Sequence, residues 1–114
     1  MSWREAETRN EVRARSRNEW IDQANLSFGA KHLTTFVCEC GDGTCVTSIR
    51  LTKPEYERVR SGSTHFALAL NHENPEAETV IREYPRYAVV DKVEPCDRHI
   101  ALETNPRFGP RGEP

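Results

Sequence analysis

The sequence predicts an α+β domain in which a long N-terminal helix precedes a small antiparallel sheet with one short helix, stabilised by zinc and followed by a disordered C-terminal tail. Three observations lead to this fold class. Residues 3–24 contain no Gly or Pro, residues 36–45 hold three of the four cysteines, and residues 105–114 are rich in Pro and Gly. A chain of 114 residues fits one domain. The expected segments are an N-terminal helix (1–26), a zinc-stabilised α+β domain (27–95) and a flexible tail (96–114).

Composition and charge limit the classes of function that the chain fits. Charged residues make up 30% of the chain and the formal net charge is -2, with a sequence pI near 6.1 and a mean hydropathy of -0.76. This balance argues against a surface that serves throughout as a counter-charge for nucleic acid or an anionic membrane. The first residues show no signal-peptide pattern, and no apolar run reaches the roughly 20 residues of a membrane span. We therefore expect a cytoplasmic protein, in which clustered cysteines are more often metal ligands than disulfides.

Residues 3–24 are expected to form the leading helix because helix-forming residues dominate there. Its apolar positions are sparse, and only Trp20, Ile21 and Ala24 share a face near its C-terminal end. We therefore expect the second half of the helix to dock on the domain and the first half to project or fray. The charged residues are expected to form a solvated face, in which acidic side chains balance basic ones: Arg13, Arg15 and Arg17 with Glu11, Glu19 and Asp22.

Alternating and β-branched runs predict the strands. The expected strands are residues 33–40, 46–51, 66–70, 78–84 and 86–93. The first two are joined antiparallel by the tight turn 41–44, and the last two form a hairpin. Thr52 and Glu55 fit a capping box that begins a short helix, with Tyr56 and Val59 on its inner face.

The hairpin that contains the cysteines is expected to supply three ligands of a zinc site. Cys38 and Cys40 point to the same side of an extended chain, and the glycines on either side of Asp42 allow a turn that returns Cys45 to them. Zinc takes thiolates at about 2.3 Å and prefers four ligands in a tetrahedron. A fourth ligand is therefore expected from elsewhere in the chain. Redox-active or free thiols are the alternative, since a disulfide between Cys38 and Cys40 would close an unusually small ring.

Five side chains are candidates for the fourth ligand: His72, His65, His32, Cys96 and His99. His72 is favoured because it continues the alternation of bulky residues in strand 66–70. His65 has the opposite phase if that strand is regular, and Cys96 and His99 lie near a loose end. A lone histidine beside an apolar strand is more often a hydrogen-bonded structural residue, and only the missing ligand strengthens the case for His72.

A set of motifs runs along the chain as far as Lys92: Arg17-Asn18-Glu19 with Ile21, Phe36-Val37-Cys38-Glu39-Cys40 with Cys45, Leu51-Thr52 with Glu55-Tyr56-Glu57 and Val59-Arg60, Phe66, His72-Glu73, and Tyr87 with Val89-Val90 and Lys92. Together they resemble a family of small uncharacterised proteins common in actinobacteria. Family members usually carry Gly where this chain has Asn71, which also tolerates left-handed geometry. The resemblance implies that Cys38, Cys40, Cys45 and His72 belong together, disfavours Cys96 as a ligand, and implies no activity.

The expected function follows by elimination. The chain lacks the deaminase signature, His-Glu-x-x-His, a phosphate-cradling glycine loop and a nucleophile elbow, so we assign no catalytic residues. We expect a zinc-stabilised protein-interaction module of a regulatory, accessory kind. Its protein partner would contact the leading helix and the tail.

Two alternatives belong to other classes. A nucleic-acid-binding regulatory protein would use the arginines of the leading helix and of the tail together with Arg58, Arg60, Arg82 and Arg86, although acidic residues are interleaved with nearly all of them. A small zinc enzyme would keep only the three cysteines on the metal, with a bound water and Glu73 or Glu39 nearby as the base.

Overall fold

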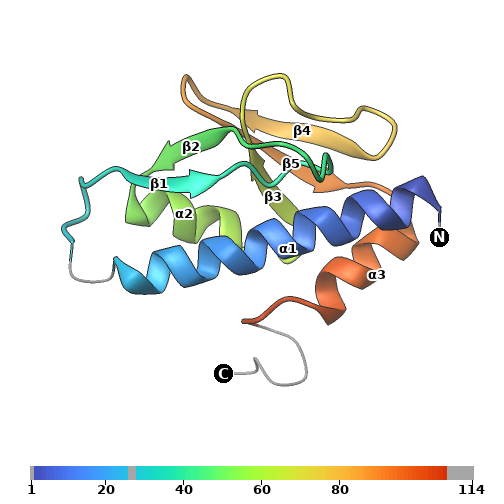
Figure 1. Ribbon diagram of the computed structural model, residues 1–114, viewed down its shortest axis with the longest axis horizontal. Coiled ribbons are helices and arrows are strands. Elements are labelled where there is room, and N and C mark those ends of the chain that lie inside the picture. The colour runs from blue at the N-terminus through green and yellow to red at the C-terminus, as the bar shows by residue number, and fades with distance from the viewer. Residues whose placement is uncertain (1, 26–27, 108–114) are drawn as a thin grey trace.

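The computed structural model describes residues 2–25 and 28–107, and these form an α+β arrangement of helices and antiparallel strands (Figure 1). The elements are α1 (Trp3–Ala24), β1 (Thr34–Val37), β2 (Ser48–Leu51), α2 (Lys53–Arg60), β3 (His65–Leu68), β4 (Glu78–Glu83), β5 (Ala88–Lys92) and α3 (Pro95–Glu103). The predicted class, with its long N-terminal helix, antiparallel strands and short helix, is confirmed.

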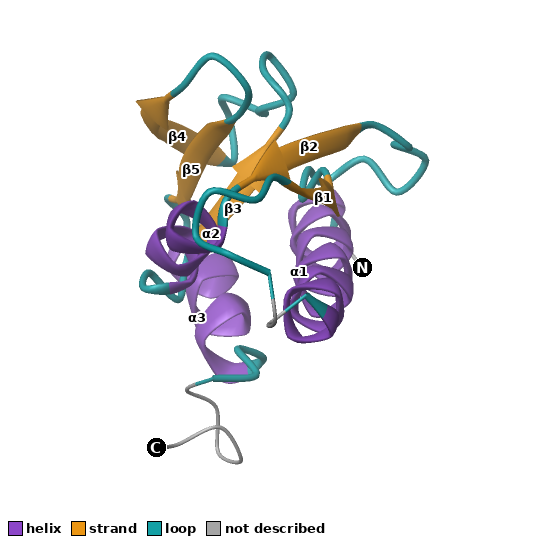
Figure 2. Cartoon of the chain, turned by 90° about the vertical axis from the view of Figure 1, so that its left-hand side faces the viewer, coloured by secondary structure: helices purple, strands orange, loops and turns teal. Residues whose placement is uncertain are grey.

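The strands form two small antiparallel sheets rather than the single sheet expected. β1 pairs with β2, with Phe36 opposite Ile49, and the second sheet has the order β3-β5-β4, with Phe66 opposite Val90. Directly after β1, the backbone N–H of Glu39 donates to the carbonyl of Ala67 in β3 at 2.8 Å. Figure 2 shows that the strands lie in one layer and the helices below it. The hairpin that carries the cysteines therefore meets the second sheet at the start of its loop.

Helix α1 packs along its whole length, and the face that it buries is polar. The Ser2 hydroxyl caps its first turn by accepting from the N–H of Glu5 at 3.2 Å. The buried residues recur every three or four positions: Thr8, Glu11, Arg15, Asn18 and Asp22. The expectation of a fraying first half is wrong, and so is the placement of Glu11, Arg15 and Asp22 on a solvated face. A buried polar stripe requires partners on the facing elements.

Those partners come from distant parts of the chain. The guanidinium of Arg15 donates to the carbonyl of Ser63 at 2.9 Å and to that of Ala101 at 3.0 Å. The amide of Asn18 both donates to the carbonyl of Val37 and accepts from its N–H, each at 2.9 Å. This pair of bonds satisfies the backbone of Val37 at the outer edge of β1, as a neighbouring strand would at that residue.

The apolar face predicted for α1 does not dock. Trp20 is 77% exposed, Ala24 is exposed, and only Ile21 packs partly against the core. Two of the three residues of the predicted face are thus left on the surface. Polar side chains hold the helix to the domain.

Helix α2 begins and packs as the sequence predicts. The Thr52 hydroxyl accepts from the N–H of Glu55 at 3.3 Å, and the Glu55 carboxylate accepts from the N–H of Thr52 at 2.8 Å, which completes the capping box. Tyr56 and Val59 are buried. The ring of Tyr56 stacks on Phe36 of β1 with centroids 4.4 Å apart, so α2 covers the hairpin from one side.

Part of the segment expected to be a flexible tail (96–114) is structured. Residues from Pro95 to Glu103 form α3, and Ala101 is fully buried. The helix packs against α1 because Arg15 reaches across to the carbonyl of Ala101. That partner lies 86 positions away in sequence, so no local pattern reveals it. The remainder of the expected tail, residues 108–114, lies outside the described residues.

Candidate metal centre

The hairpin of β1 and β2 brings three cysteines together. Cys38 and Cys40 follow the last residue of β1, and the N–H of Cys38 extends the antiparallel ladder through a 3.0 Å bond to the chain before β2. The chain then reverses. The Asp42 carboxylate accepts from the N–H of Thr44 at 2.9 Å, and the N–H of Cys45 donates to the carbonyl of Asp42 at 3.1 Å. This turn returns Cys45 toward the other two thiols.

Helix α1 fixes the position of this turn. The side chain of Asn10 donates to the carbonyl of Gly41 at 2.9 Å. A Cβ added to Gly41 would lie 2.6 Å from the Glu7 carboxylate, which is closer than a real contact. Glycine at this position therefore permits the close approach of helix and turn.

His72 reaches the cysteines from a turn after β3. The strand ends at Leu68, and the N–H of His72 donates to the carbonyl of Ala69 at 3.2 Å. Asn71 lies in the left-handed region with φ 66°, a conformation that Asn adopts more readily than most residues. The position of His72 agrees with its choice as the fourth ligand, but for a different reason. A turn brings the imidazole to the cysteines, whereas the alternation in the sequence predicted that the strand continues to this residue.

The four side chains place their ligand atoms in a compact cluster. The three Sγ atoms and one imidazole nitrogen all lie within 4.8 Å of one another. His72 Nδ1 is 3.6 Å from the Sγ of Cys38 and 3.6 Å from the Sγ of Cys45. A tetrahedral ion with Zn–S of about 2.3 Å and Zn–N of about 2.0 Å has S···N edges of roughly 3.6 Å. The cluster could therefore hold a metal ion.

The local electrostatics suit a cation. Cys38 and Cys40 are buried and Cys45 is half-buried. A hydrogen bond from the Cys40 thiol lowers the pKa of Cys38, and the N–H of Ala69, 3.2 Å from the Cys38 Sγ, adds to this effect despite the opposing burial. The same thiol pair raises the pKa of Cys40, because Cys40 holds the shared proton. A divalent ion would replace that proton and take up the thiolate charge.

The other candidates for the fourth ligand lie elsewhere. Within the described residues, the cluster of Cys38, Cys40, Cys45 and His72 is the one group of three or more such side chains that could share an ion. His65 is 3.8 Å from Asp91, and His32 stacks on Phe28. Cys96 is exposed, and His99, also exposed, lies beside Glu103 on α3.

Sequence reasoning missed the role of Glu39, which it treated only as a possible base. Glu39 is fully buried. Its carboxylate accepts from both terminal nitrogens of Arg60, at 2.6 and 2.9 Å, from the Asn18 amide at 2.7 Å and from the N–H of Ala67 at 2.9 Å. The residue between the first two cysteines is thus bonded to α1, α2 and β3. The spacing of these partners, 21 and 28 positions away, gives no signal in the sequence.

Several arginines proposed for nucleic-acid contact are used inside the protein. Arg15 and Arg60 are buried. Arg86 forms two hydrogen bonds with the Glu55 carboxylate, at 2.9 and 3.1 Å. These three guanidinium groups are therefore not free to neutralise phosphates.

Comparisons with protein-family models, with curated proteins and with solved structures find no match to this chain. The resemblance to an actinobacterial family therefore stays a prediction from the motifs. Among residues 2–25 and 28–107, no helix has both the length and the apolar character needed to cross a bilayer.

Proposed function

We propose that Cys38, Cys40, Cys45 and His72 bind one zinc ion with a structural role, in a small protein-interaction module. The observation that carries the metal assignment is the cluster of four ligand atoms within 4.8 Å. Three thiolates and an imidazole are a donor set that zinc favours over harder cations. Four protein ligands leave no position for a reacting water, so the site supports a structural role better than catalysis.

The ion would join parts of the fold that the backbone leaves separate. Three ligands come from the β1–β2 hairpin, whereas His72 follows β3 of the second sheet. A metal bound by both parts would close a long loop and so lower the conformational entropy of the unfolded chain. This matters in a small domain, which buries a smaller fraction of its surface than a large one. A zinc ion would thus stabilise the packing of one sheet against the other.

Metal analysis of matched cysteine variants tests this assignment. Freshly purified protein is expected to contain about one zinc per chain, a ratio set by the four-ligand cluster. Cys40→Ser should lose the metal, and His72→Ala should retain it less tightly. Cys96→Ser is the control and should keep the full metal content, because Cys96 is an exposed residue of α3 outside the cluster. Wild-type protein without stoichiometric metal would overturn the assignment.

The interaction role is supported by an apolar surface beside the metal centre. Trp20 is 77% and Val46 94% exposed. A shallow pocket is lined by Trp20, Ile21, Val37 and Arg17, and a neighbouring groove shares Val37 and Arg17 and continues to Val46. We call these five residues the Trp20 face. Trp and Arg are common energetic centres of protein interfaces, and both residue types occur in this face.

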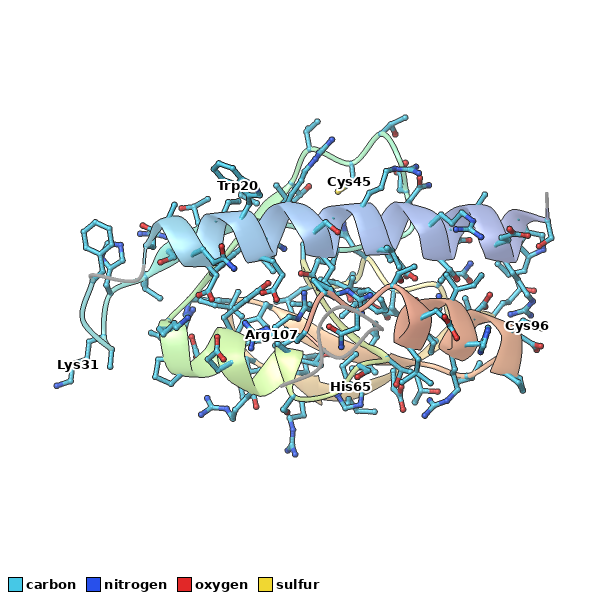
Figure 3. The ribbon with its side chains drawn as sticks, turned by 90° about the horizontal axis from the view of Figure 1, so that it is seen from below. Trp20, Lys31, Cys45, His65, Cys96 and Arg107 are labelled. Atoms are coloured by element: carbon cyan, nitrogen blue, oxygen red, sulfur yellow. The ribbon has the colours of Figure 1, made fainter. Side chains whose placement is uncertain are left out.

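The Trp20 face indicates the chemistry of its partner. Figure 3 places Trp20 and Cys45 on the same side of α1, so the loop that holds the metal also presents Val46 next to the helix. Arg17 is exposed at the edge of the apolar residues. A protein segment with apolar side chains and a nearby carboxylate would complement this face.

Affinity capture from the source cells with surface variants tests the interaction role. Wild-type protein should retain a defined partner, and Trp20→Ala and Val46→Ser should each reduce capture by about tenfold or more, as expected for central interface residues. Leu102→Ala is the control, since Leu102 is another exposed apolar residue, at 50%, but lies on α3. Equal capture by all variants would contradict an interface at the Trp20 face.

The same preparations distinguish the two alternatives. A nucleic-acid-binding protein would retain DNA or RNA and release it with a steep dependence on salt. A zinc enzyme would carry an exchangeable water on the metal, which a site with four protein ligands excludes. Glu39, one of the bases considered for such an enzyme, is buried in its ion pair with Arg60.

A further inference from the structure

The last described residues form a strap that returns from α3 to the groove between α1 and α2. Arg15 of α1 donates to the Thr104 hydroxyl at 3.2 Å. The Asn105 side chain, which is buried, donates to the Ser63 hydroxyl at 3.0 Å. Arg107 then lies between the two helices, on the side of α1 opposite Trp20 (Figure 3).

The guanidinium of Arg107 is held by two carboxylates at once. Its Nε and Nη2 donate to the two oxygens of Glu19 at 2.7 and 3.0 Å. Its Nη1 and Nη2 donate to the two oxygens of Glu57 at 2.7 and 2.9 Å. Asp22 lies 3.6 Å from Nη2, and the ring centre of Tyr56 is 5.9 Å from the guanidinium carbon. Both carboxylates are therefore bound in the bidentate geometry that is specific to arginine.

Other residues hold these acidic side chains in place. The Tyr56 hydroxyl donates to Glu19 at 2.9 Å. Lys53 lies 2.6 Å from Asp22 and 3.1 Å from Glu57. The groove thus presents three carboxylates against the one ammonium of Lys53, and it remains net negative by one charge even with Arg107 in place. Preorganised groups lose less conformational freedom when they bind a ligand.

The contacts of Arg107 outside its own segment are made by its side chain. Its backbone N–H donates locally to Asn105 at 2.9 Å, and residues 104–107 form neither helix nor strand. The guanidinium could therefore leave the groove without the unfolding of any regular element. The two helices would keep the carboxylates where they are.

We propose that the groove between α1 and α2, formed by Glu19, Asp22, Tyr56 and Glu57, is an arginine-binding site that Arg107 closes in cis, and that an arginine-bearing segment of a protein partner replaces it. The chain itself identifies the ligand, because an arginine side chain already fills the groove. The strap acts as a competitor at high local concentration, so only a partner with additional contacts would displace it. This site is separate from the Trp20 face and does not depend on it.

The test uses the full chain with the substitution Arg107→Ala. The probe is a single arginine, acetyl-arginine-N-methylamide, added at millimolar concentration. Binding is measured from the NMR shifts of the backbone amides of α1 and α2. The variant should bind the probe with saturable shifts, and wild-type protein should bind it about tenfold or more weakly, because Arg107 occupies the groove. Acetyl-lysine-N-methylamide carries the same charge but cannot bridge two carboxylates, so it should bind much more weakly.

Two further variants exclude a general effect of charge. Arg86→Ala removes the arginine that pairs with Glu55, away from the groove, and should not create a comparable site. Adding Glu57→Gln to Arg107→Ala should abolish most of the binding. If the Arg107→Ala chain does not fold, Arg107→Lys serves in its place, because it keeps the charge but vacates one of the two carboxylates. No saturable binding to either variant, equal binding to wild-type protein, or no preference of arginine over lysine would overturn the proposal.

Discussion

Glu39 is a buried carboxylate that fixes the position of two cysteines in the candidate metal centre. It lies between Cys38 and Cys40 and binds Arg60 with both oxygens. The charges of this pair are fully removed from water. Such a pair adds little net stability by itself, but removing one partner leaves an uncompensated charge in the interior. Its main consequence is the fixed position of the two cysteines on either side.

We therefore expect Glu39→Gln to destabilise the protein by on the order of 3 kcal/mol, because the Arg60 guanidinium loses its buried counter-charge. Urea unfolding of the metal-loaded protein measures this change. Glu73→Gln, next to His72 but only half-buried, is the control and should change the free energy of unfolding by less than about 0.5 kcal/mol. Similar small effects of both substitutions would show that Glu39 has no special role.

At the scale of elements, α2 is the case in which local sequence and tertiary packing agree. The capping box of Thr52 and Glu55 satisfies backbone groups at the first turn, and Arg86 binds the same Glu55 carboxylate. The inner residues Tyr56 and Val59 are buried. Local signals were sufficient here because the cap and the apolar face lie within eight residues.

Thr52→Ala is expected to lower the free energy of unfolding by about 1 kcal/mol, because the N–H of Glu55 loses its acceptor. Thr47→Ala removes the same atoms from an exposed loop position and should have almost no effect. Thermal unfolding of both variants under the same conditions checks the difference. Equal melting temperatures would argue against the cap.

Helix α1 is the opposite case, because its buried face is polar and includes the ionisable side chain of Glu11. Lys92 of β5 lies 2.8 Å from Glu11 and 3.2 Å from Glu78 of β4. Burial, and then the neighbouring Glu78, raise the pKa of Glu11 from 4.5 to about 10 against the attraction of Lys92. One ammonium thus faces two carboxylates, and Glu11 keeps its proton.

The raised pKa predicts that stability falls as the pH rises. Above pH 4.5 the unfolded chain releases the Glu11 proton while the folded chain retains it. The free energy of unfolding therefore falls with each pH unit until Glu11 also ionises in the folded state. Glu11→Gln removes this effect and should gain at least about 1 kcal/mol relative to wild type between pH 5 and pH 9. Glu5→Gln, on the exposed side of α1, is the control. A growing loss of stability in Glu11→Gln with pH would mean that Glu11 is ionised and pairs with Lys92.

For the whole molecule, the question is what holds two small sheets together. Glu39, which follows β1, forms two hydrogen bonds with Ala67 of β3. Its N–H donates to the carbonyl of Ala67, and its carboxylate accepts from the N–H of Ala67. The cluster of three cysteines and His72 lies at the same junction. A sheet of two strands is not stable alone, so the junction determines whether the hairpin folds.

Removal of the metal is therefore expected to abolish the cooperative unfolding transition, since structural zinc contributes on the order of 10 kcal/mol or more in comparable domains. Calorimetry before and after treatment with a chelator measures the loss, and readded zinc should restore the transition. Cys96→Ser should respond like wild type, because Cys96 lies outside the cluster. An unchanged transition after complete metal removal would contradict a structural role.

The sequence alone determined the features that depend on near neighbours. The spacing of Cys38, Cys40 and Cys45 around a glycine-containing turn predicted the hairpin with its three thiols, and Thr52 with Glu55 predicted the start of α2. These patterns act over a few residues, so they can be recognised without the rest of the chain.

Only the tertiary structure decided what the polar residues of α1 contact and that residues 95–103 form a helix. Arg15 binds the carbonyl of Ala101, 86 positions away, and so holds α3 in a segment that looked unstructured. Asn18 pairs with the backbone of Val37 at the open edge of β1. A buried polar residue and a solvated one look alike in sequence, because the difference lies in a distant partner that satisfies its hydrogen bonds.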